Sequence, residues 1–157
     1  GVIIILYFCL MIQVTKIFRF ETAHAIHGYN GHCRNIHGHS YVLHVTVGSD
    51  ADDMAYLPKP GFVIDFKDLK KIVNRIIVEQ LDHRLILSQD FLAEHPHAAA
   101  SENLIIWEME PTAENILLYI RNVLLAELPN EIKLRKLKYR MKEVILLVDK
   151  INNMKIK

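Results

Sequence analysis

The chain has 157 residues, of which 51% are hydrophobic and 24% charged, and its formal net charge is +1. This length and composition predict one domain with its own core and exclude an intrinsically disordered segment. The small net charge argues against nucleic-acid binding driven by overall charge. Two cysteines, Cys9 and Cys33, make no disulfide framework, and with nine histidines they favour a reducing, cytoplasmic location.

The first twelve residues, GVIIILYFCLMI, are almost wholly apolar. They are too few to span a bilayer, and they lack the basic start and the small-residue cleavage site of a signal peptide. They fit either a buried or interface strand or an extension upstream of a natural start at Met11. We favour the second interpretation, with residues 1–10 as a non-native apolar N-terminal extension and residues 11–157 as a single domain.

Alternating apolar and polar residues predict a strand over residues 12–20 and a second over 37–48, separated by a loop rich in glycine and asparagine. The short apolar run at residues 62–64 predicts a third strand. Asp65 is a typical helix N-cap, and apolar residues at helical spacing carry the helix that follows to about Gln80.

Residues 88–103 form a long connection, which in a compact domain is often functional or an interface element. Residues 104–107 predict a short strand, and Thr112 caps a second helix that Pro129 ends. The run Val-Ile-Leu-Leu-Val at 144–148 predicts a closing strand buried on both faces. This order predicts an α+β fold, a mostly antiparallel sheet with two helices packed on one face.

His37 and His39 are separated only by Gly38. On an extended segment they would share one face, and a neighbouring strand would bring His24 to the same point. Three neutral imidazoles fit a zinc ion whose fourth position is open, as in catalytic zinc sites. The alternative is that all three are ordinary polar residues of a loop and strand.

Cys33 precedes His37 by four residues. It is either the fourth zinc ligand, which would close the site and make it structural, or a free thiol beside the metal. A nearby Zn²⁺ lowers a thiol's pKa, so a thiol that does not ligate would be a base or nucleophile at neutral pH. The spacing leaves both alternatives open.

Asp82 and His83 are adjacent at the expected end of the first helix, where the helix dipole alone accounts for a histidine. The functional alternative is a carboxylate and imidazole pair that relays protons. Capping explains Thr112 and Glu114, although helix N-termini also offer free N–H groups to ligands. The remaining histidines are expected to be ordinary polar residues: His27, His32, His44, His95 and His97.

Five motifs in this chain occur in the order typical of one family. They are Phe20-x-x-Ala23-His24, Cys33-x-x-x-His37-Gly38-His39-x-Tyr41, Gly61-Phe62-Val63-Ile64-Asp65-Phe66 with Leu69 beyond, Leu81-Asp82-His83, and Pro111-Thr112-Ala113-Glu114-Asn115. From Met11 to about Asn153 the chain resembles the 6-pyruvoyl-tetrahydropterin synthase / 6-carboxytetrahydropterin synthase family, which has the tunnelling fold.

The resemblance implies that His24, His37 and His39 bind a catalytic Zn²⁺. It implies that Cys33 is a base rather than a ligand. Asp82 and His83 would be a proton relay contributed by a neighbouring subunit.

The resemblance also implies a pterin substrate bound beside Thr112 and Glu114, with neither nucleic acid nor membrane as partner. It implies a homohexamer, a dimer of trimers whose sheets join into a barrel with active sites at subunit interfaces. The family closes with a strand that ends in Glu-Thr, whose glutamate holds the pterin. Here the corresponding run is Leu147-Val148-Asp149-Lys150. Either Asp149 replaces that glutamate, or the run aligns with the family's strand in another register, or the pterin is anchored more weakly.

The spacer of three residues between Cys33 and His37 resembles that of the bacterial and archaeal enzymes of 7-deazaguanine (queuosine) biosynthesis. Animal biopterin enzymes have a longer spacer. Retention of Cys33 argues against the folate branch, which carries glutamate there. The resemblance therefore favours a 6-carboxy-5,6,7,8-tetrahydropterin synthase acting on 7,8-dihydroneopterin triphosphate. The alternatives are a 6-pyruvoyl-tetrahydropterin synthase and, from another class, a non-catalytic zinc-stabilised oligomerisation module.

Overall fold

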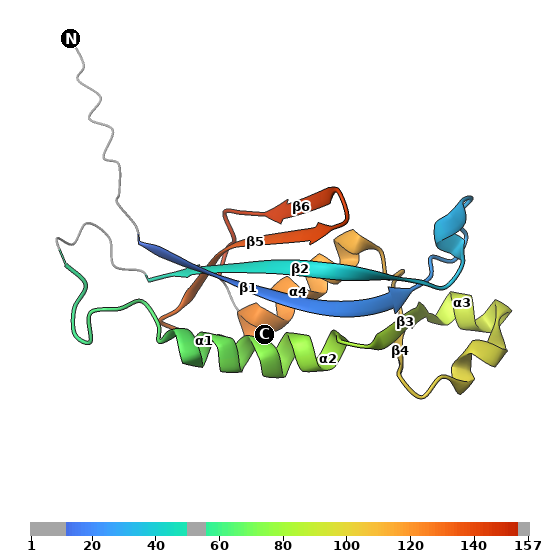
Figure 1. Cartoon of the computed structure of the whole chain (residues 1–157), viewed down its shortest axis with the longest axis horizontal. Helices are drawn as coiled ribbons and strands as arrows, with labels where there is room; N and C mark the ends of the chain where they lie inside the picture. Colours follow the sequence, from blue (N-terminus) through green and yellow to red (C-terminus); the bar gives the residue numbers. More distant parts are fainter. Residues whose placement is uncertain (1–11, 50–55, 154–157) are drawn as a thin grey trace, which may run out of the picture.

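The computed structural model describes residues 12–49 and 56–153, so the expectation for residues 1–10 lies outside the described residues. A six-stranded mixed sheet has the strand order β4-β3-β1-β2-β5-β6 (Figure 1). The pairs β1–β2, β2–β5 and β5–β6 are antiparallel, and β1–β3 and β3–β4 are parallel. The strands are β1 Gln13–His24, β2 His37–Gly48, β3 Arg84–Ser88, β4 Leu104–Trp107, β5 Lys133–Met141 and β6 Val144–Val148.

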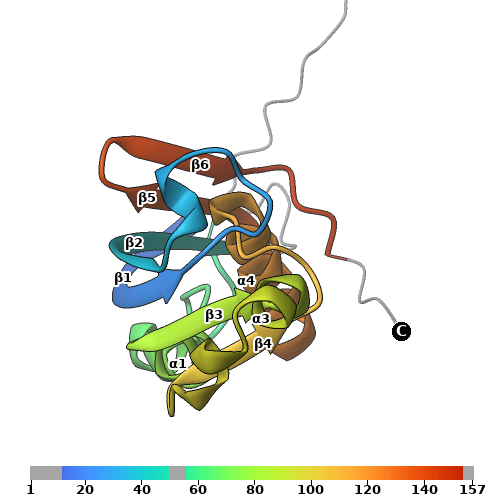
Figure 2. The ribbon, with the colours of Figure 1, turned by 90° about the vertical axis from the view of Figure 1, so that its right-hand side faces the viewer.

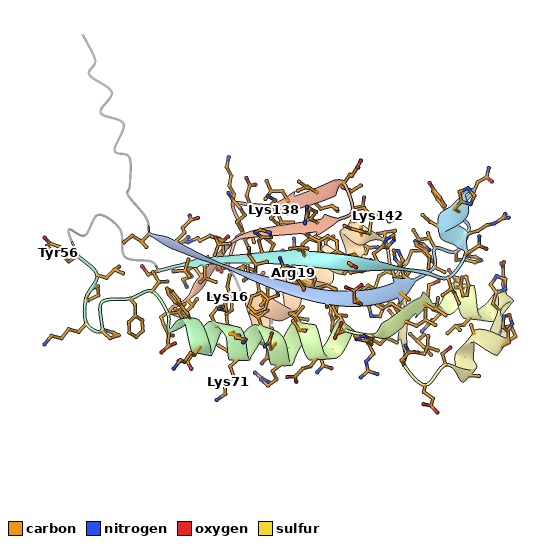
Figure 3. All side chains as sticks on the ribbon, viewed as in Figure 1. Lys16, Arg19, Tyr56, Lys71, Lys138 and Lys142 are labelled. Carbon is orange, nitrogen blue, oxygen red and sulfur yellow. The ribbon has the colours of Figure 1, made fainter. Side chains whose placement is uncertain are left out.

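The two longest strands, β1 and β2, form the centre of the sheet. They pair without interruption from Gln13 opposite Gly48 to His24 opposite His37. Because side chains alternate between the faces of a strand, Phe18 and Phe20 of β1 share one buried face with the inward residues of β2. The opposite face is open: Arg19 and Lys138 lie along it in Figure 3, and Ile17 is 47% exposed.

Helices cover the buried face. The helical turns α1 (Phe66–Val73), η2 (Asn74–Val78, a π-helical turn) and α2 (Glu79–Leu81) follow one another without a break. The helix α4 (Ala113–Glu127) lies on the same side of the sheet (Figures 1 and 2). As predicted, Asp65 caps α1, its carboxylate accepting a hydrogen bond from the Lys67 N–H at 2.7 Å. These helices and the inward strand residues make one hydrophobic core.

A smaller helical layer covers the other face of β3. It consists of α3 (Gln89–Glu94) and the 3₁₀ turn η3 (Pro96–Ala100), which occupy most of the predicted connection. Leu85 and Leu87 of β3 pack against it, whereas Ile86 packs in the main core. No helix in the described ranges is both long and apolar enough to cross a bilayer.

The α+β class and the helices on one face are confirmed. The predicted strand at 62–64 is wrong: the chain bends there, and Phe62 is 51% exposed while Ile64 enters the core. The strands β3 and β5 lie outside the predicted elements, although Leu137, Tyr139 and Met141 alternate with basic residues along β5.

The predicted closing strand exists as β6, but the expectation that it is buried on both faces is wrong. Val144, Ile145 and Leu147 are 52%, 55% and 54% exposed. The reason is topological: β6 lies at the edge of the sheet, with only β5 beside it. Its apolar composition therefore leaves an apolar sheet edge uncovered within one chain.

The sheet-to-helix core predicts the effect of Leu43→Ala, which removes a side chain that is 0% exposed. We expect the free energy of unfolding to fall by about 2–5 kcal/mol, because a cavity replaces packed methyl groups. Urea unfolding of the purified protein measures it. Leu118→Ala, at a position that is 38% exposed, is the control and should change it by about 0.5 kcal/mol or less. Equal losses in both variants would contradict this description of the core.

Candidate functional site

The three histidines predicted to converge lie at one end of the β1–β2 pair. His24 ends β1 and faces His37, the first residue of β2, and His39 is two residues further on the same face. Their ring centroids are 4.6 Å (His24–His37), 5.2 Å (His24–His39) and 4.8 Å (His37–His39) apart. One ligand atom from each lies within 4.8 Å of the other two. The predicted convergence is therefore confirmed.

The hydrogen bonds of two of these rings fix their tautomers. His24 Nδ1 lies 2.5 Å from the Pro111 carbonyl oxygen, and His37 Nδ1 lies 2.7 Å from that of Asn35. A carbonyl oxygen only accepts, so each Nδ1 donates and each Nε2 keeps a free lone pair. Backbone carbonyls that orient imidazoles in this way are typical of the surroundings of metal ligands.

The remaining nitrogens fit a cation. His24 Nε2, His37 Nε2 and His39 Nδ1 are buried without a hydrogen-bond partner in the part of the chain that the structure describes. An unpaired buried polar atom is costly, and a metal ion would satisfy all three. Burial lowers the pKa of His24 and holds that of His39 at about 4, with neighbouring histidines adding to the effect. Both rings are thus neutral at pH 7, as metal binding requires.

Cys33 lies in the short 3₁₀ turn η1 (His32–Arg34) of the loop between β1 and β2. Its thiol is free and half-buried. The cluster of donor atoms within 4.8 Å contains the three histidines and not Cys33. In this arrangement Cys33 does not close the site, which leaves it available as a base.

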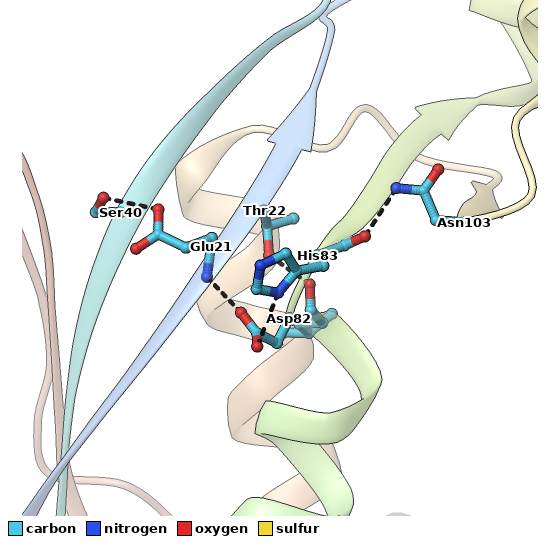
Figure 4. A network of polar contacts seen from close by, with 7 residues as sticks. Glu21, Thr22, Ser40, Asp82, His83 and Asn103 are labelled. Carbon is cyan, nitrogen blue, oxygen red and sulfur yellow. Dashed lines mark hydrogen bonds and ion pairs between the residues drawn. The ribbon is translucent and has the colours of Figure 1, made fainter.

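Asp82 and His83 form a tightly held pair at the turn between α2 and β3. Asp82 Oδ2 lies 3.0 Å from His83 Nδ1, and its Oδ1 accepts the Glu21 N–H at 2.8 Å, as Figure 4 shows. The bond from Glu21, more than the contact with His83, lowers the pKa of Asp82. The carboxylate therefore stays ionised and orients the ring.

The backbone of His83 is also constrained. Its φ is 57°, a left-handed conformation that costs a non-glycine residue about 1–3 kcal/mol. Two bonds hold it there. The His83 N–H donates to the Glu21 carbonyl at 2.7 Å. Figure 4 shows the second, in which Asn103 Nδ2 donates to the His83 carbonyl at 2.7 Å. The side chain is 81% exposed. A strained backbone that presents an exposed imidazole points to function more than to the helix dipole.

An open cleft of about 400 Å³ lies beside His83, and of the three histidines only His39 lines it. It is lined by His39, His83, Glu21 and Asn103, among others. No hydrogen bond or ion pair within the described residues links His83 directly to the three histidines. Within one chain the Asp82–His83 pair and the histidine cluster are therefore separate groups.

The segment before α4 reaches the same end of the sheet. Pro111 contributes the carbonyl that holds His24, and Thr112 caps the helix by accepting the Asn115 N–H at 3.1 Å, as predicted. Glu114 is exposed in the first turn. Its charge lies close enough to add to the effect of burial in raising the pKa of Tyr139.

Two buried tyrosines beside the cluster were not among the predicted site residues. Tyr41 and Tyr139 stack with centroids 4.8 Å apart, and the ring of His39 lies 5.8 Å from that of Tyr41. Burial raises the pKa of Tyr41 to about 12. The alternating pattern of β5 is the signal that places Tyr139 on this face.

Asp149 is not brought to the site. It follows β6, whose last residue, Val148, lies opposite Leu137, whereas the end of β5 near the histidines is Met141, opposite Tyr41. The register thus puts Asp149 toward the far end of the sheet, where it is exposed. The reason is that the β5–β6 hairpin, absent from the predicted elements, reverses the chain before residue 144.

Comparisons with known proteins agree with this geometry. The family model for 6-pyruvoyl tetrahydropterin synthase matches residues 13–146. A 6-carboxy-5,6,7,8-tetrahydropterin synthase from Rickettsia felis is 32% identical over 120 residues, which are 75% of this chain and 83% of that protein. The Haemophilus influenzae protein of the same name is 40% identical over 79 residues, 50% of this chain and 55% of that one.

A solved structure shows the same fold. The 6-pyruvoyl tetrahydropterin synthase of Caenorhabditis elegans superposes with a TM-score of 0.64 at 21% identity, covering 89% of this chain and 96% of that one. The family model spans most of the chain, including β1, β2 and both halves of the cleft. The chain therefore belongs to the 6-pyruvoyl tetrahydropterin synthase family.

Proposed function

We propose that this protein is a zinc-dependent 6-carboxy-5,6,7,8-tetrahydropterin synthase of 7-deazaguanine (queuosine) biosynthesis. It would convert 7,8-dihydroneopterin triphosphate and water into 6-carboxy-5,6,7,8-tetrahydropterin, acetaldehyde and triphosphate. The observation that carries the proposal is the set of three buried imidazole nitrogens without partners beside an open cleft. Curated relatives named for this activity, and the three-residue spacer after Cys33, support the choice of product.

The proposed roles follow from the positions of the side chains. His24 and His37 would bind zinc through Nε2 and His39 through Nδ1, the atoms left without partners. A bound zinc ion supplies a Lewis acid that polarises the substrate's side-chain hydroxyls and acidifies the adjacent C–H groups. Cys33 is the base that accepts a proton from carbon.

His83, oriented by Asp82, exchanges protons with the substrate's side chain. Thr112 and Glu114 would hold the pterin at the start of α4, where a carboxylate accepts N–H bonds from a guanidine-like edge. The stacked Tyr41 and Tyr139 lie beside His39 of the histidine cluster.

The uncovered apolar residues of β6 support a homohexamer, a dimer of trimers in which sheets join into a barrel and active sites lie between subunits. In this assembly the relay pair of one subunit would serve the histidine cluster of its neighbour. We place the protein in the cytoplasm, where its thiol stays reduced.

The test of the proposed function is incubation of the purified, zinc-loaded protein with 7,8-dihydroneopterin triphosphate, followed by mass spectrometry. A carboxy product with acetaldehyde supports the proposal, and a pyruvoyl side chain would assign the sister activity instead. Absence of turnover, with a zinc site that X-ray absorption shows to be closed by four protein ligands, would establish the oligomerisation module. Three nitrogens and one water-like oxygen around zinc would exclude that module.

Zinc should stay bound in weakly acidic solution. Burial holds the pKa of His39 at about 4, so this ring remains neutral as the pH falls through 6, and burial lowers the pKa of His24 below its ordinary value of 6.5. Protons therefore compete with the metal at lower pH than they do at exposed histidines. We expect about one zinc per chain after dialysis at about pH 5.5, measured by atomic absorption. Release with a midpoint near the ordinary histidine pKa would contradict the burial of this site.

Cys33→Ala should keep one zinc per chain and lower kcat by about 10²- to 10⁴-fold, the usual contribution of a general base. Metal analysis and turnover of the triphosphate substrate measure the two effects. His32→Ala, an exposed residue in the same turn, is the matched control and should leave both unchanged. Loss of zinc together with activity in Cys33→Ala would make Cys33 a ligand.

Mixing inactive variants tests whether the relay pair comes from a neighbouring subunit. Cys33→Ala and His83→Ala chains, unfolded together and reassembled, should regain activity, because some sites combine an intact Cys33 with an intact partner His83. If the two chains are mixed in equal amounts and assemble at random, about a quarter of the sites contain both an intact Cys33 and an intact His83. No recovery, in a mixture that native mass spectrometry shows to be mixed, would assign the pair to its own chain.

A further inference from the structure

A second group of metal-ligating side chains lies outside the three-histidine site. His27, Asp90 and Glu110 each place a ligand atom within 4.8 Å of the other two. Glu94 adjoins them, its Oε1 3.1 Å from His27 Nε2. These four residues, the His27 cluster, come from three segments: the loop after β1, the helix α3 and the turn before α4.

The geometry of the cluster fits a divalent cation. Metal–nitrogen and metal–oxygen bonds of about 2.0–2.2 Å put neighbouring ligand atoms about 3 to 3.6 Å apart and opposite ones about 4 to 4.4 Å apart. The observed separations reach 4.8 Å at most, so small rotamer adjustments would complete a coordination sphere. Glu110 is already held in place, because its Oε2 accepts the His27 N–H at 2.8 Å.

The charges of the cluster are unbalanced. Two carboxylates, those of Asp90 and Glu110, converge on His27, and a third, that of Glu94, pairs with His27 Nε2. Arg34 lines the same cleft as His27 and Glu94 but pairs with none of these carboxylates. Like charges this close repel one another, and a dication would reverse the balance.

We propose that His27, Asp90 and Glu110 bind a divalent transition-metal cation, separately from the three-histidine site. A site with one imidazole and two carboxylates favours Mn²⁺, Fe²⁺ or Zn²⁺ over Ca²⁺ and Mg²⁺, because the last two ions prefer ligands that are all oxygen. This site goes beyond the proposed function and does not depend on it.

The bound cation would join the loop of Cys33 to the rest of the site. The Ile26 N–H, next to His27 in the chain, donates to the Cys33 carbonyl at 2.9 Å and closes this loop. Glu110 precedes Pro111, whose carbonyl holds His24. A cation that links His27, Asp90 and Glu110 would thus anchor the Cys33 loop and the His24 contact to α3.

The probe is Mn²⁺, added to the full chain already loaded with one equivalent of zinc, and bound Mn²⁺ is measured by electron paramagnetic resonance. We expect one Mn²⁺ per chain. Glu110→Gln and Asp90→Asn keep the shape of each side chain and should each weaken Mn²⁺ binding at least tenfold, about the loss caused by removing an outer-shell partner. Glu102→Gln, at an exposed glutamate between η3 and β4, is the matched control and should bind as the unaltered chain does.

His27→Gln provides a second, independent variant, and circular dichroism establishes that each variant is folded. Failure of the unaltered, zinc-loaded chain to bind Mn²⁺ at millimolar concentration would overturn the proposal. Equal binding by all four variants would also overturn it and leave His27 and Glu94 as an ion pair only. Mn²⁺ binding is measured without a pterin, so failure of the proposed reaction would not affect the conclusion about the His27 cluster.

Discussion

The register between β1 and β2 is the constraint on which the site depends. The two strands pair over their full length, and this places His24 opposite His37 at one end. A slip of one residue would turn every side chain of a strand to the opposite face, so it would expose Phe18 and Phe20 and separate the histidines at the same time. The core that fixes the register therefore also fixes the convergence of the three histidines.

Backbone groups complete what the register begins. The Pro111 and Asn35 carbonyls orient His24 and His37, so their free nitrogens face the same point. Pro111 occupies that position because α4 packs on the buried face of the sheet, with Thr112 capping its first turn. The site is thus assembled from a sheet end, a loop and a helix start, each held by its own hydrogen bonds.

The Asp82–His83 pair shows a different kind of placement. It stands at the start of β3, which runs parallel to β1, and Glu21 of β1 holds both the carboxylate of Asp82 and the backbone of His83. The pair is rigid although the imidazole is exposed. A strained backbone conformation costs folding free energy and is found mostly at functional sites. It is consistent with a side chain that contacts a bound molecule or a neighbouring subunit.

Local patterns were enough to predict much of this protein. Alternation predicted β1 and β2, helical spacing and capping residues predicted α1–α2 and α4, and the His-x-His spacing with His24 predicted the cluster. These features depend on residues close in the sequence or on one long strand pair, so the amino-acid pattern by itself determined them. The motifs in the chain pointed to the family, which the comparisons confirm.

Only the tertiary structure decided the rest. Apolar and basic residues alternate along β5, which is a pattern that the sequence shows. The β5–β6 hairpin, however, reverses the chain and so places Asp149 away from the site. The apolar composition of β6 predicts a buried strand, but its position at the edge of the sheet leaves three of its side chains exposed. His27, Asp90 and Glu110 lie far apart in the sequence, and no spacing rule joins them. Contacts between distant segments depend on packing, and packing is decided by the whole chain at once.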